Sequence, residues 1–320
     1  MATAEQIKSL LRSHFDNDSE RFLTISLQVA AHEAKQGHSS LAEDIKGLVD
    51  KAKNSNRKII HLQPDLSELI ILREPDAHLS DLIVTDSMRS RLNRLLKEYH
   101  QKEKIFKFGL ENRRKILLSG PPGTGKTLTA SVIAGELHMP LYIILVDKLI
   151  TKYMGETAAK LRQIFDAISS NVGVYLFDEF DAIGAERGRD NEVGEMRRVL
   201  NAFLQFIEND ASESFIIAAT NNIEILDQAL FRRFDDVLHY SLPQKEQITQ
   251  LLNNRLGTFR GDYSLESLTF MIDGLSHADV CKACDDAIKE TILDNKEKTT
   301  KESLITMLND RREAYGKYHS

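Results

Sequence analysis

The chain has 320 residues, of which 42 are basic and 48 acidic, so its formal net charge is −6. A hydrophobic fraction of 42% and a charged fraction of 28% exclude an intrinsically disordered chain. Average usage predicts roughly 22 glycines and 16 prolines in this length, yet the chain has 16 and 6. This scarcity of turn residues disfavours an all-β sandwich and favours a helix-rich or α/β protein.

Other classes of protein are disfavoured by what the sequence lacks. We expect no membrane span, because no run of about 18 apolar residues occurs, and no secretory signal, because the start of the chain has no apolar core of that kind. Two cysteines suit a reducing cytoplasm rather than a disulfide scaffold. The mildly acidic total gives no indication of nucleic-acid binding. The sequence therefore predicts a cytoplasmic protein.

The first 53 residues are predicted to be helical. Apolar residues recur at helical spacing in three stretches, and two of these begin at capping-box pairs, Thr3 with Gln6 and Ser40 with Glu43. Three short helices must bury their apolar stripes against one another or against a partner, so we interpret 1–53 as an N-terminal module that binds an adaptor or partner protein. Residues 54–78 are interpreted as a linker, with short β-like runs at 59–62 and 69–72.

Beyond residue 79, helical stretches alternate with buried strands. A helix is expected from Asp86, and five short apolar runs suit buried parallel strands, at 115–118, 141–146, 174–177, 215–219 and 237–240. Helical stretches separate these runs, which predicts a five-stranded parallel sheet covered on both faces. Four helical stretches follow Pro243. The sequence therefore predicts an α/β domain at 79–242 and a helical lid at 243–320.

A phosphate-binding loop follows the first of these strands. It has the pattern G-x-x-x-x-G-K-[ST] and leads into a helix, and its candidate nucleotide-binding residues are Gly120, Pro121, Pro122, Gly123, Thr124, Gly125, Lys126, Thr127 and Leu128. Glycines let successive backbone amides point at phosphate oxygens, and the helix N-terminus adds positive potential. We expect Lys126 to contact the terminal phosphates of ATP and the Thr127 hydroxyl to bind Mg²⁺. The strand–loop–helix context disfavours the alternative of an ordinary glycine turn.

Two carboxylates follow the strand at 174–177. Because ligands bind at the carboxyl ends of parallel strands, Asp178 and Glu179 should face the phosphate loop. Asp178 is then a Mg²⁺ ligand beside Thr127, and Glu179 is the candidate base for the attacking water. Asn221, after the strand at 215–219, is a candidate for positioning that water. An acidic strand end by itself is usually a solvated loop, so these assignments depend on the phosphate loop.

Two adjacent arginines, Arg232 and Arg233, lie in the segment 226–235. A basic pair of this kind is most often a solvated surface. The alternative is a pair of arginine fingers, which contact the nucleotide of a neighbouring subunit and are worth roughly a thousandfold or more in rate.

Taken together, these segments resemble the AAA ATPase module over residues 80–315. The phosphate loop is similar to Walker A, 174–179 to Walker B, Asn221 to sensor 1 and 226–235 to the second region of homology. The resemblance implies Mg²⁺-dependent ATP hydrolysis, a five-stranded P-loop NTPase domain with a four-helix lid, and a hexameric ring in which the two arginines act across subunit interfaces.

Two further resemblances narrow the group. The usual spacing in the family is arginine, two residues, arginine, whereas the adjacent arginines of this chain resemble the compact variant of the severing and ESCRT-disassembly branch. The segments 152–168 and 192–210 resemble a group of small bacterial AAA ATPases. Some members of that group lie beside protease genes, which implies a protease as one kind of partner.

Tyr153, Met154 and Gly155 follow the second strand of the α/β domain. At this position the family resemblance implies a pore loop, in which an aromatic side chain grips an extended polypeptide in a central channel. The segment 184–194 is implied to be a second pore-facing loop. The alternative for Tyr153 is simple packing in a core.

The segment 274–280 resembles the part of the AAA lid that faces the nucleotide, so His277 and Ala278 are candidate nucleotide-binding residues. His277 stands where the family has glycine. His277, Cys281 and Cys284 also share one face of a helix. A metal site needs about four ligands, so buried helix cysteines are favoured over a zinc site.

Two functions follow from these observations. The first is an ATP-driven protein remodeller or unfoldase, a ring-shaped homo-oligomer that threads or disassembles a protein substrate and binds an adaptor or protease through 1–53. The alternative is a nucleic-acid-associated AAA motor or loader, which the acidic total and the Tyr153 segment disfavour. A scaffold that barely hydrolyses ATP is disfavoured because the lysine, the carboxylates, the asparagine and the arginines are all present.

Overall fold

The structure is a computed structural model that describes residues 4–15, 19–55, 66, 68–149, 154–184, 190–225, 228–272 and 274–316. Its internal contacts divide the chain into two units, Met1–His61 and Leu62–Ser320. Within the described ranges, every helix falls short of the length and apolar character that a membrane crossing requires.

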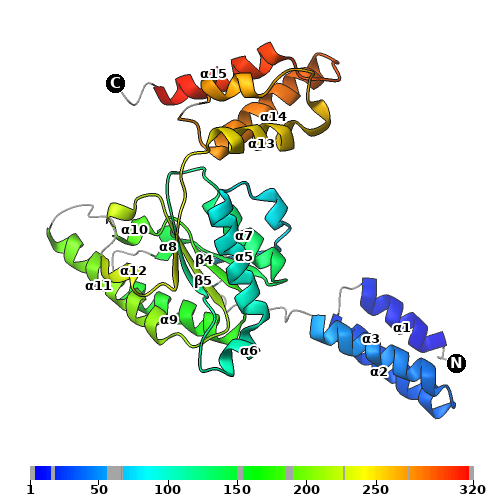
Figure 1. The fold of residues 1–320 in the computed structure, drawn as a ribbon. Helices are drawn as coiled ribbons and strands as arrows, with labels where there is room; N and C mark the ends of the chain where they lie inside the picture. Colours follow the sequence, from blue (N-terminus) through cyan, green and yellow to red (C-terminus); the bar gives the residue numbers. More distant parts are fainter. Residues whose placement is uncertain are drawn as a thin grey trace. The chain divides into compact units, whose positions relative to one another are not determined.

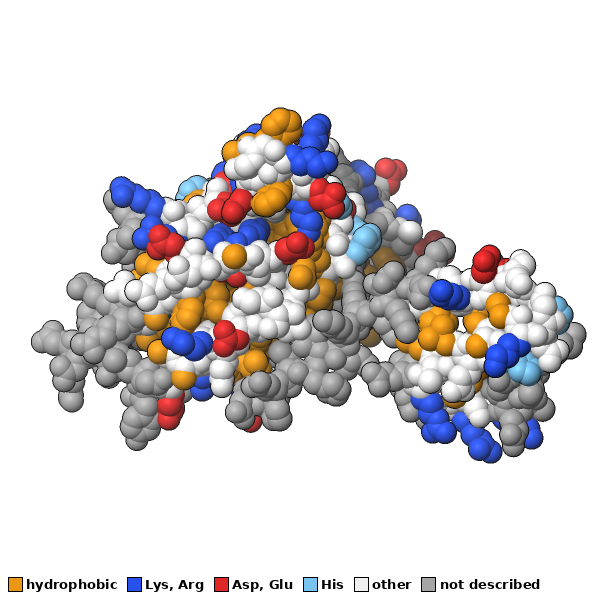
Figure 2. All heavy atoms as spheres, turned by 90° about the horizontal axis from the view of Figure 1, so that it is seen from below, with side chains coloured by type: hydrophobic (Ala, Val, Ile, Leu, Met, Phe, Trp, Pro, Cys, Tyr) orange, Lys and Arg blue, Asp and Glu red, His pale blue; other side chains and the backbone are white. Residues whose placement is uncertain are grey.

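The N-terminal unit is built from helices, as the sequence predicts. Helix α2 (Ser19–Lys35) packs against both α1 (Ala4–Phe15) and α3 (Ser39–Ser55). The buried apolar side chains described in it are Ile25, Val29, Ala30, Ala42 and Val49. Hydrophobic side chains also reach the surface (Figure 2), among them Leu11, Phe22, Leu41 and Leu48. The unit therefore presents apolar surface to solvent.

The larger unit is built around a mostly parallel sheet. Its described strands lie in the order β1-β3-β4-β5-β2-β6. Their bounds are Ile70–Arg73 for β1, Lys115–Ser119 for β2, Leu141–Ile144 for β3, Val174–Phe177 for β4, Phe215–Thr220 for β5 and Asp236–His239 for β6. All neighbouring pairs are parallel except β1 and β3. The five predicted parallel strands therefore all occur.

The sixth described strand, β1, comes from the segment that the sequence pattern places in a linker. It pairs antiparallel with the edge of β3, with Ile70 opposite Ile144 and Arg73 opposite Leu141. Leu69 and Ile70 are buried, whereas Ile71 and Leu72 are exposed, as expected for a short edge strand. The apolar run at 69–72 indicates β structure, but not which strand it joins. The other β-like run, 59–62, lies outside the described residues.

Helices cover both faces of the sheet (Figure 1). Helices α5 (Asp86–His100) and α7 (Lys126–Glu136) share one core with alternate residues of the strands. On the opposite face, Phe165 of α9 (Met154–Ser170) and Phe203 of α11 (Asp190–Asn209) pack against Phe177 of β4, with ring centroids 6.1 and 5.0 Å from it. Both faces of the central strands are thus buried, which is why those strands are continuously apolar.

The C-terminal part of this unit forms a helical lid with its own core. The four helical stretches predicted after Pro243 correspond to α13 (Lys245–Leu256), the 3₁₀ helix η4 (Glu266–Met271), α14 (His277–Leu293) and α15 (Lys301–Gly316). Leu252, Leu268, Val280 and Leu304 are among the fully buried residues of this core, and Ile83 packs with them. Ile83 therefore joins the segment before α5 to the lid.

Short elements connect these parts. They are η1 (Leu79–Asp81), α6 (Lys102–Phe106), α8 (Val146–Leu149), α10 (Asp181–Gly184), η2 (Ile223–Ile225), α12 (Gln228–Phe231) and η3 (Gly257–Phe259).

Candidate active site

The phosphate loop connects β2 to α7, as predicted. Gly120 has φ +143° and Gly123 has φ +72°, backbone conformations that side chains disfavour. A Cβ atom on Gly120 would lie 2.2 Å from the Tyr240 carbonyl oxygen, and one on Gly123 would lie 2.5 Å from Ser276 Oγ. The glycines are therefore required both by backbone conformation and by the close approach of β6 and the lid.

Lys126 is the first residue of α7 and is buried. Its Nζ donates hydrogen bonds to the carbonyl oxygens of Gly120 (2.7 Å) and Pro121 (2.8 Å), so the amino group lies inside the loop. Burial lowers the pKa of Lys126, and the charges of Asp178 and Asp181 oppose that shift. Among the described residues, its recorded hydrogen bonds go to neutral carbonyl groups, so this buried amino group is well suited to an anionic ligand.

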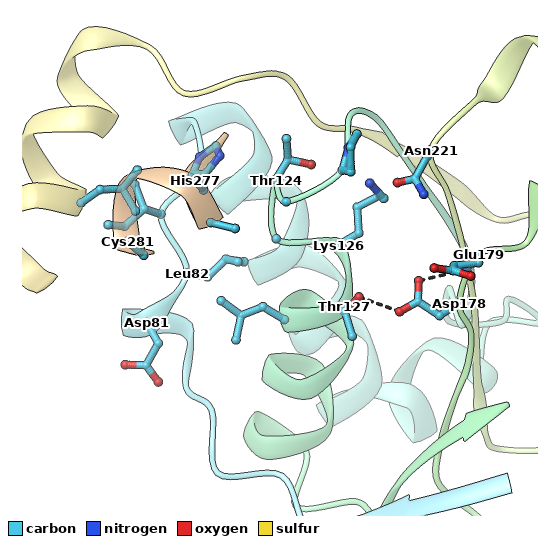
Figure 3. Close-up of a pocket in the computed structure, with 17 residues that line it drawn as sticks. Asp81, Leu82, Thr124, Lys126, Thr127, Asp178, Glu179, Asn221, His277 and Cys281 are labelled. Atoms are coloured by element: carbon cyan, nitrogen blue, oxygen red, sulfur yellow. Dashed lines mark hydrogen bonds between the residues drawn. The ribbon is translucent and has the colours of Figure 1, made fainter. Parts of the chain in front are cut away.

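The two carboxylates at the end of β4 lie beside this loop. Thr127 Oγ1 donates a 2.7 Å hydrogen bond to Asp178 Oδ2, and the Glu179 amide donates to Asp178 Oδ1 at 3.0 Å (Figure 3). Glu179 is exposed and has φ +53°, a conformation that costs a non-glycine residue about 1–3 kcal/mol. The strained turn presents its carboxylate to the solvent side of the site.

A cavity of about 450 Å³ joins these groups to the lid. Figure 3 shows His277 and Cys281 of α14 at one end, the carboxylates and Asn221 at the other, and the phosphate loop between them. Of the predicted site residues, twelve line it: Pro122, Gly123, Thr124, Gly125, Lys126, Thr127, Leu128, Asp178, Glu179, Asn221, His277 and Ala278. Gly120 and Pro121 flank it and accept the Lys126 hydrogen bonds. Residues from three strand ends and the lid thus meet at one cavity.

The structure adds lining residues that the sequence did not indicate. They are Asp81, Leu82, Ile83, Leu251 and Cys281. Residues 81–83 lie just before Thr85, the N-cap of α5. They carry no sequence motif that would indicate a nucleotide site. In the sequence, Cys281 is distinguished only by its helical spacing from His277. The aliphatic side chains and backbone of this end suit the flat, largely apolar base of a nucleotide.

The lid is attached directly to the phosphate loop. The Ala278 amide donates a 2.9 Å hydrogen bond to the Gly123 carbonyl oxygen. Ser276 and Asp279 form a buried capping box that fixes the start of α14 at this point. Burial lowers the pKa of the neighbouring His277, and the Ile83 backbone partly offsets this shift.

The alternative of a zinc site finds no support in the described part of the chain, where no group of three His, Cys, Asp or Glu side chains is arranged to hold a metal ion. Cys284 is buried, and burial raises the pKa of its thiol to about 12. Cys284 is therefore a buried helix cysteine, as expected, whereas Cys281 is only half-buried.

Arg232 and Arg233 are exposed after α12 and are not among the described residues that line the cavity of the same chain. Arg233 Nη2 lies 3.2 Å from Glu208 Oε2 of α11. The structure therefore does not bring the two arginines to their own nucleotide site.

The predicted pore loop lies partly outside the described residues. Tyr153 lies outside the described residues, and Met154 and Gly155 begin α9, with no description of their surroundings. Of the second predicted pore-facing segment, 185–189 also lie outside the described residues.

The parallel sheet, the glycine loop between β2 and α7 and the lid over it define a P-loop NTPase fold. The profile of the ATPase family associated with various cellular activities (AAA) matches residues 116–242. The chain is 32% identical over 317 residues to an uncharacterized AAA family ATPase, y4kL, of Sinorhizobium fredii, covering 97% of this chain and 96% of that protein. The chain belongs to the AAA family of ATPases.

The chain is also similar to archaeal proteins that are named proteasome-activating nucleotidases. A proteasome-activating nucleotidase of Saccharolobus islandicus is 32% identical over 263 residues, which are 78% of this chain and 67% of that protein. One of Methanoregula boonei is 33% identical over 216 residues, or 64% of this chain and 49% of that protein.

Proposed function

We propose that this AAA ATPase is a protein remodeller or unfoldase that hydrolyses ATP with Mg²⁺ and acts as a ring-shaped homo-oligomer, most simply a hexamer. The observation that carries the proposal is the meeting of Lys126, Thr127, Asp178, Glu179 and Asn221 at one cavity. Names of archaeal relatives, proteasome-activating nucleotidases, support protein rather than nucleic acid as the substrate.

The residues of the cavity fit ATP and Mg²⁺. The glycine loop leaves a cradle that side chains would fill, and Lys126 supplies a buried positive charge. The Thr127 hydroxyl and the Asp178 carboxylate, already 2.7 Å apart, are the oxygen ligands that Mg²⁺ prefers. When bound, Mg²⁺ and ATP supply the phosphoryl group for transfer and the charge that offsets its oxygens.

The remaining polar groups are assigned to the attacking water. Glu179 accepts a proton from that water at its exposed carboxylate. Asn221 orients the same water through its side-chain amide. His277 and Ala278, with residues 81–83, bind the base end of the nucleotide. Removing Glu179 should therefore leave nucleotide binding intact while stopping turnover.

The arginines are assigned to a neighbouring subunit. Arg232 and Arg233 are exposed and away from their own cavity, which supports action in trans and hence a head-to-tail ring. Arg233 is held in part by Glu208, whereas no partner of Arg232 is recorded among the described residues. We therefore favour Arg232 as the first contact of the pair with the γ-phosphate.

Substrate handling is assigned to the parts of the chain that flank the site. Tyr153, Met154 and Gly155 form a pore loop that grips an extended polypeptide. Residues 1–53 bind an adaptor or protease partner, the segment before β1 connects them to the ATPase domain, which comprises β1 and 79–242, and 243–320 form the lid. The exposed apolar side chains of the N-terminal unit support a partner-binding role.

The test uses a substrate trap. The Glu179→Gln protein should bind ATP, hydrolyse little and retain protein substrate, which mass spectrometry of the captured material would identify. Tyr153→Ala should keep ATPase activity but lose substrate processing, and normal processing by this variant would exclude threading. Stimulation of the wild-type ATPase by DNA rather than by unfolded protein would contradict the proposal and favour a nucleic-acid motor.

A further inference from the structure

Asp181 connects the two strand ends that carry the water-activating groups. It begins α10, three residues beyond Asp178, and its Oδ1 accepts two hydrogen bonds from the end of β5. One comes from Thr220 Oγ1 at 3.3 Å and the other from the Asn221 amide at 3.2 Å. The carboxylate of Asp181 therefore holds the backbone of Asn221 directly.

A backbone hydrogen bond strengthens the same connection. The Phe180 amide donates to the Ala219 carbonyl oxygen at 2.8 Å, so residues 180 and 181 on one side bond to residues 219 to 221 on the other. Glu179, with φ +53°, lies in the turn between β4 and these bonds. The turn that carries Glu179 and the strand end that carries Asn221 are thus tied together at consecutive residues.

Asp181 itself does not line the nucleotide cavity among the described residues, whereas Glu179 and Asn221 do. It is partly exposed, and its charge acts on Lys126, whose pKa it raises. Its recorded hydrogen bonds go to the Asn221 segment rather than into the cavity. A role for Asp181 in turnover must therefore be exerted through the groups that it holds.

We propose that Asp181 is a positioning residue for ATP hydrolysis, which fixes Asn221 relative to Glu179 so that both address one water molecule. This inference rests on the proposed function, because it takes the roles of Glu179 and Asn221 from it. Misplacement of a reacting group by about 1 Å can lower a rate by roughly a hundredfold. Loss of Asp181 therefore lowers kcat, while nucleotide binding, which depends on the phosphate loop, is retained.

The experiment is a double-mutant cycle on the full-length protein, with kcat for ATP and Kd for a fluorescent ATP analogue as readouts. Asp181→Ala should lower kcat by roughly tenfold or more and change Kd by less than about threefold. In an Asn221→Ala background, Asp181→Ala should lower kcat by less than about twofold, because the group that it positions is already absent. Asp181→Asn keeps the accepting Oδ1 and should retain most of the wild-type kcat.

Two controls separate positioning from folding. Asp166→Ala removes one exposed carboxylate from α9 and should leave kcat unchanged. Asp181→Glu keeps the charge but shifts the carboxylate, and it replaces Asp181→Ala in the cycle if the melting temperature shows that the alanine variant does not fold. Asp181→Ala and Asp181→Glu should both lower kcat. Of the three substitutions, only Asp181→Asn should keep kcat near the wild-type value.

The outcomes distinguish this inference from the proposed function. Equal losses from Asp181→Ala with and without Asn221 would overturn the positioning role, as would parallel changes of kcat and Kd. An Asp181→Asn protein as slow as Asp181→Ala would also overturn it, because the charge rather than the accepted hydrogen bonds would then matter. A wild-type protein without ATPase activity, or a fully active Glu179→Gln protein, would instead overturn the proposed function.

Discussion

Thr127 and Asp178 are 51 positions apart in the chain, yet the hydroxyl of one donates a 2.7 Å hydrogen bond to the carboxylate of the other. Thr127 is the second residue of α7, the helix after β2, and Asp178 directly follows β4, and β5 lies between these two strands in the sheet. Because the two strand ends converge at the carboxyl edge, a hydroxyl oxygen and a carboxylate oxygen are already placed as neighbours.

This pair leads to a prediction about metal dependence. Thr127→Val removes one oxygen ligand, so the Mg²⁺ concentration for half-maximal ATPase activity should rise by roughly tenfold or more. Thr127→Ser keeps the hydroxyl and should stay near the wild-type value. A Mg²⁺ titration of the steady-state rate measures both, and an unchanged requirement in Thr127→Val would remove this residue from the metal site.

Arginine action in trans predicts complementation between two inactive proteins. The double variant Arg232→Ala, Arg233→Ala should lose roughly a thousandfold in kcat, and Glu179→Gln should also be inactive. Mixed rings contain intact sites, in which a finger-deficient subunit receives arginines from a Glu179→Gln neighbour. ATPase activity should therefore return on mixing. Continued inactivity of rings shown to contain both proteins would contradict trans action.

Loss of the Arg233–Glu208 ion pair gives a matched control for that experiment. Both side chains are about half exposed, 41% and 54%, so the pair contributes at most about 1 kcal/mol to stability. Glu208→Ala should leave the melting temperature almost unchanged. A large loss of stability in this variant would mean that arginine substitutions act on the fold as well as on the site.

Two glycines in helices should respond to alanine with opposite signs. Gly135 lies in α7, and a Cβ there would be 2.2 Å from the Ala77 carbonyl oxygen, whereas Gly47 in α3 has open space around it. Gly47→Ala should stabilise its unit by about 0.5–1 kcal/mol. Gly135→Ala should destabilise the ATPase unit by about 2 kcal/mol despite the better helix propensity. Chemical denaturation of each variant measures both, and a stabilising Gly135→Ala would show that Ala77 does not pack on α7.

The burial of His277 predicts that the stability of the protein depends on pH. Burial lowers its pKa below the ordinary value of 6.5, so the unfolded chain binds a proton at a higher pH than the folded one. The free energy of unfolding is therefore fully retained above about pH 6.5 and falls as the pH drops from there to the pKa of the folded protein. His277→Gln should show a smaller loss of melting temperature between about pH 7.5 and about pH 5.5.

Exposed His100 supplies the control for this effect. His100→Gln should lose as much melting temperature on acidification as the wild type does. An equally large loss in His277→Gln would assign the acid sensitivity to other groups.

The sequence was sufficient for the parts of the site that have chemical motifs. Gly120 to Thr127, Asp178 and Asn221 each follow a strongly apolar strand, so the sheet that those strands form brings them together. Lining residues 81–83 could not be found in this way, because they contribute backbone and aliphatic groups from a segment with no motif. Their placement depends on the packing of Ile83 into the lid core, which is a long-range contact.

The edge strand shows a second limit of sequence reasoning. The run at 69–72 has β character, but four residues carry too little information to specify a neighbour or a direction. The antiparallel pairing with β3 is determined by tertiary contacts, including the Leu145 amide donating to the Leu69 carbonyl oxygen at 2.9 Å. A pattern that specifies local structure thus leaves open whether a segment belongs to a linker or to the sheet.

That edge strand leads the chain into the carboxyl edge of the sheet. Because β1 is antiparallel to β3, its first residue, Ile70, lies opposite Ile144 at the carboxyl end of β3, the edge where the nucleotide cavity also opens. The chain after β3 continues through α8 toward Tyr153. The edge strand therefore enters the sheet beside the strand end from which the chain leads to the segment proposed to grip the substrate.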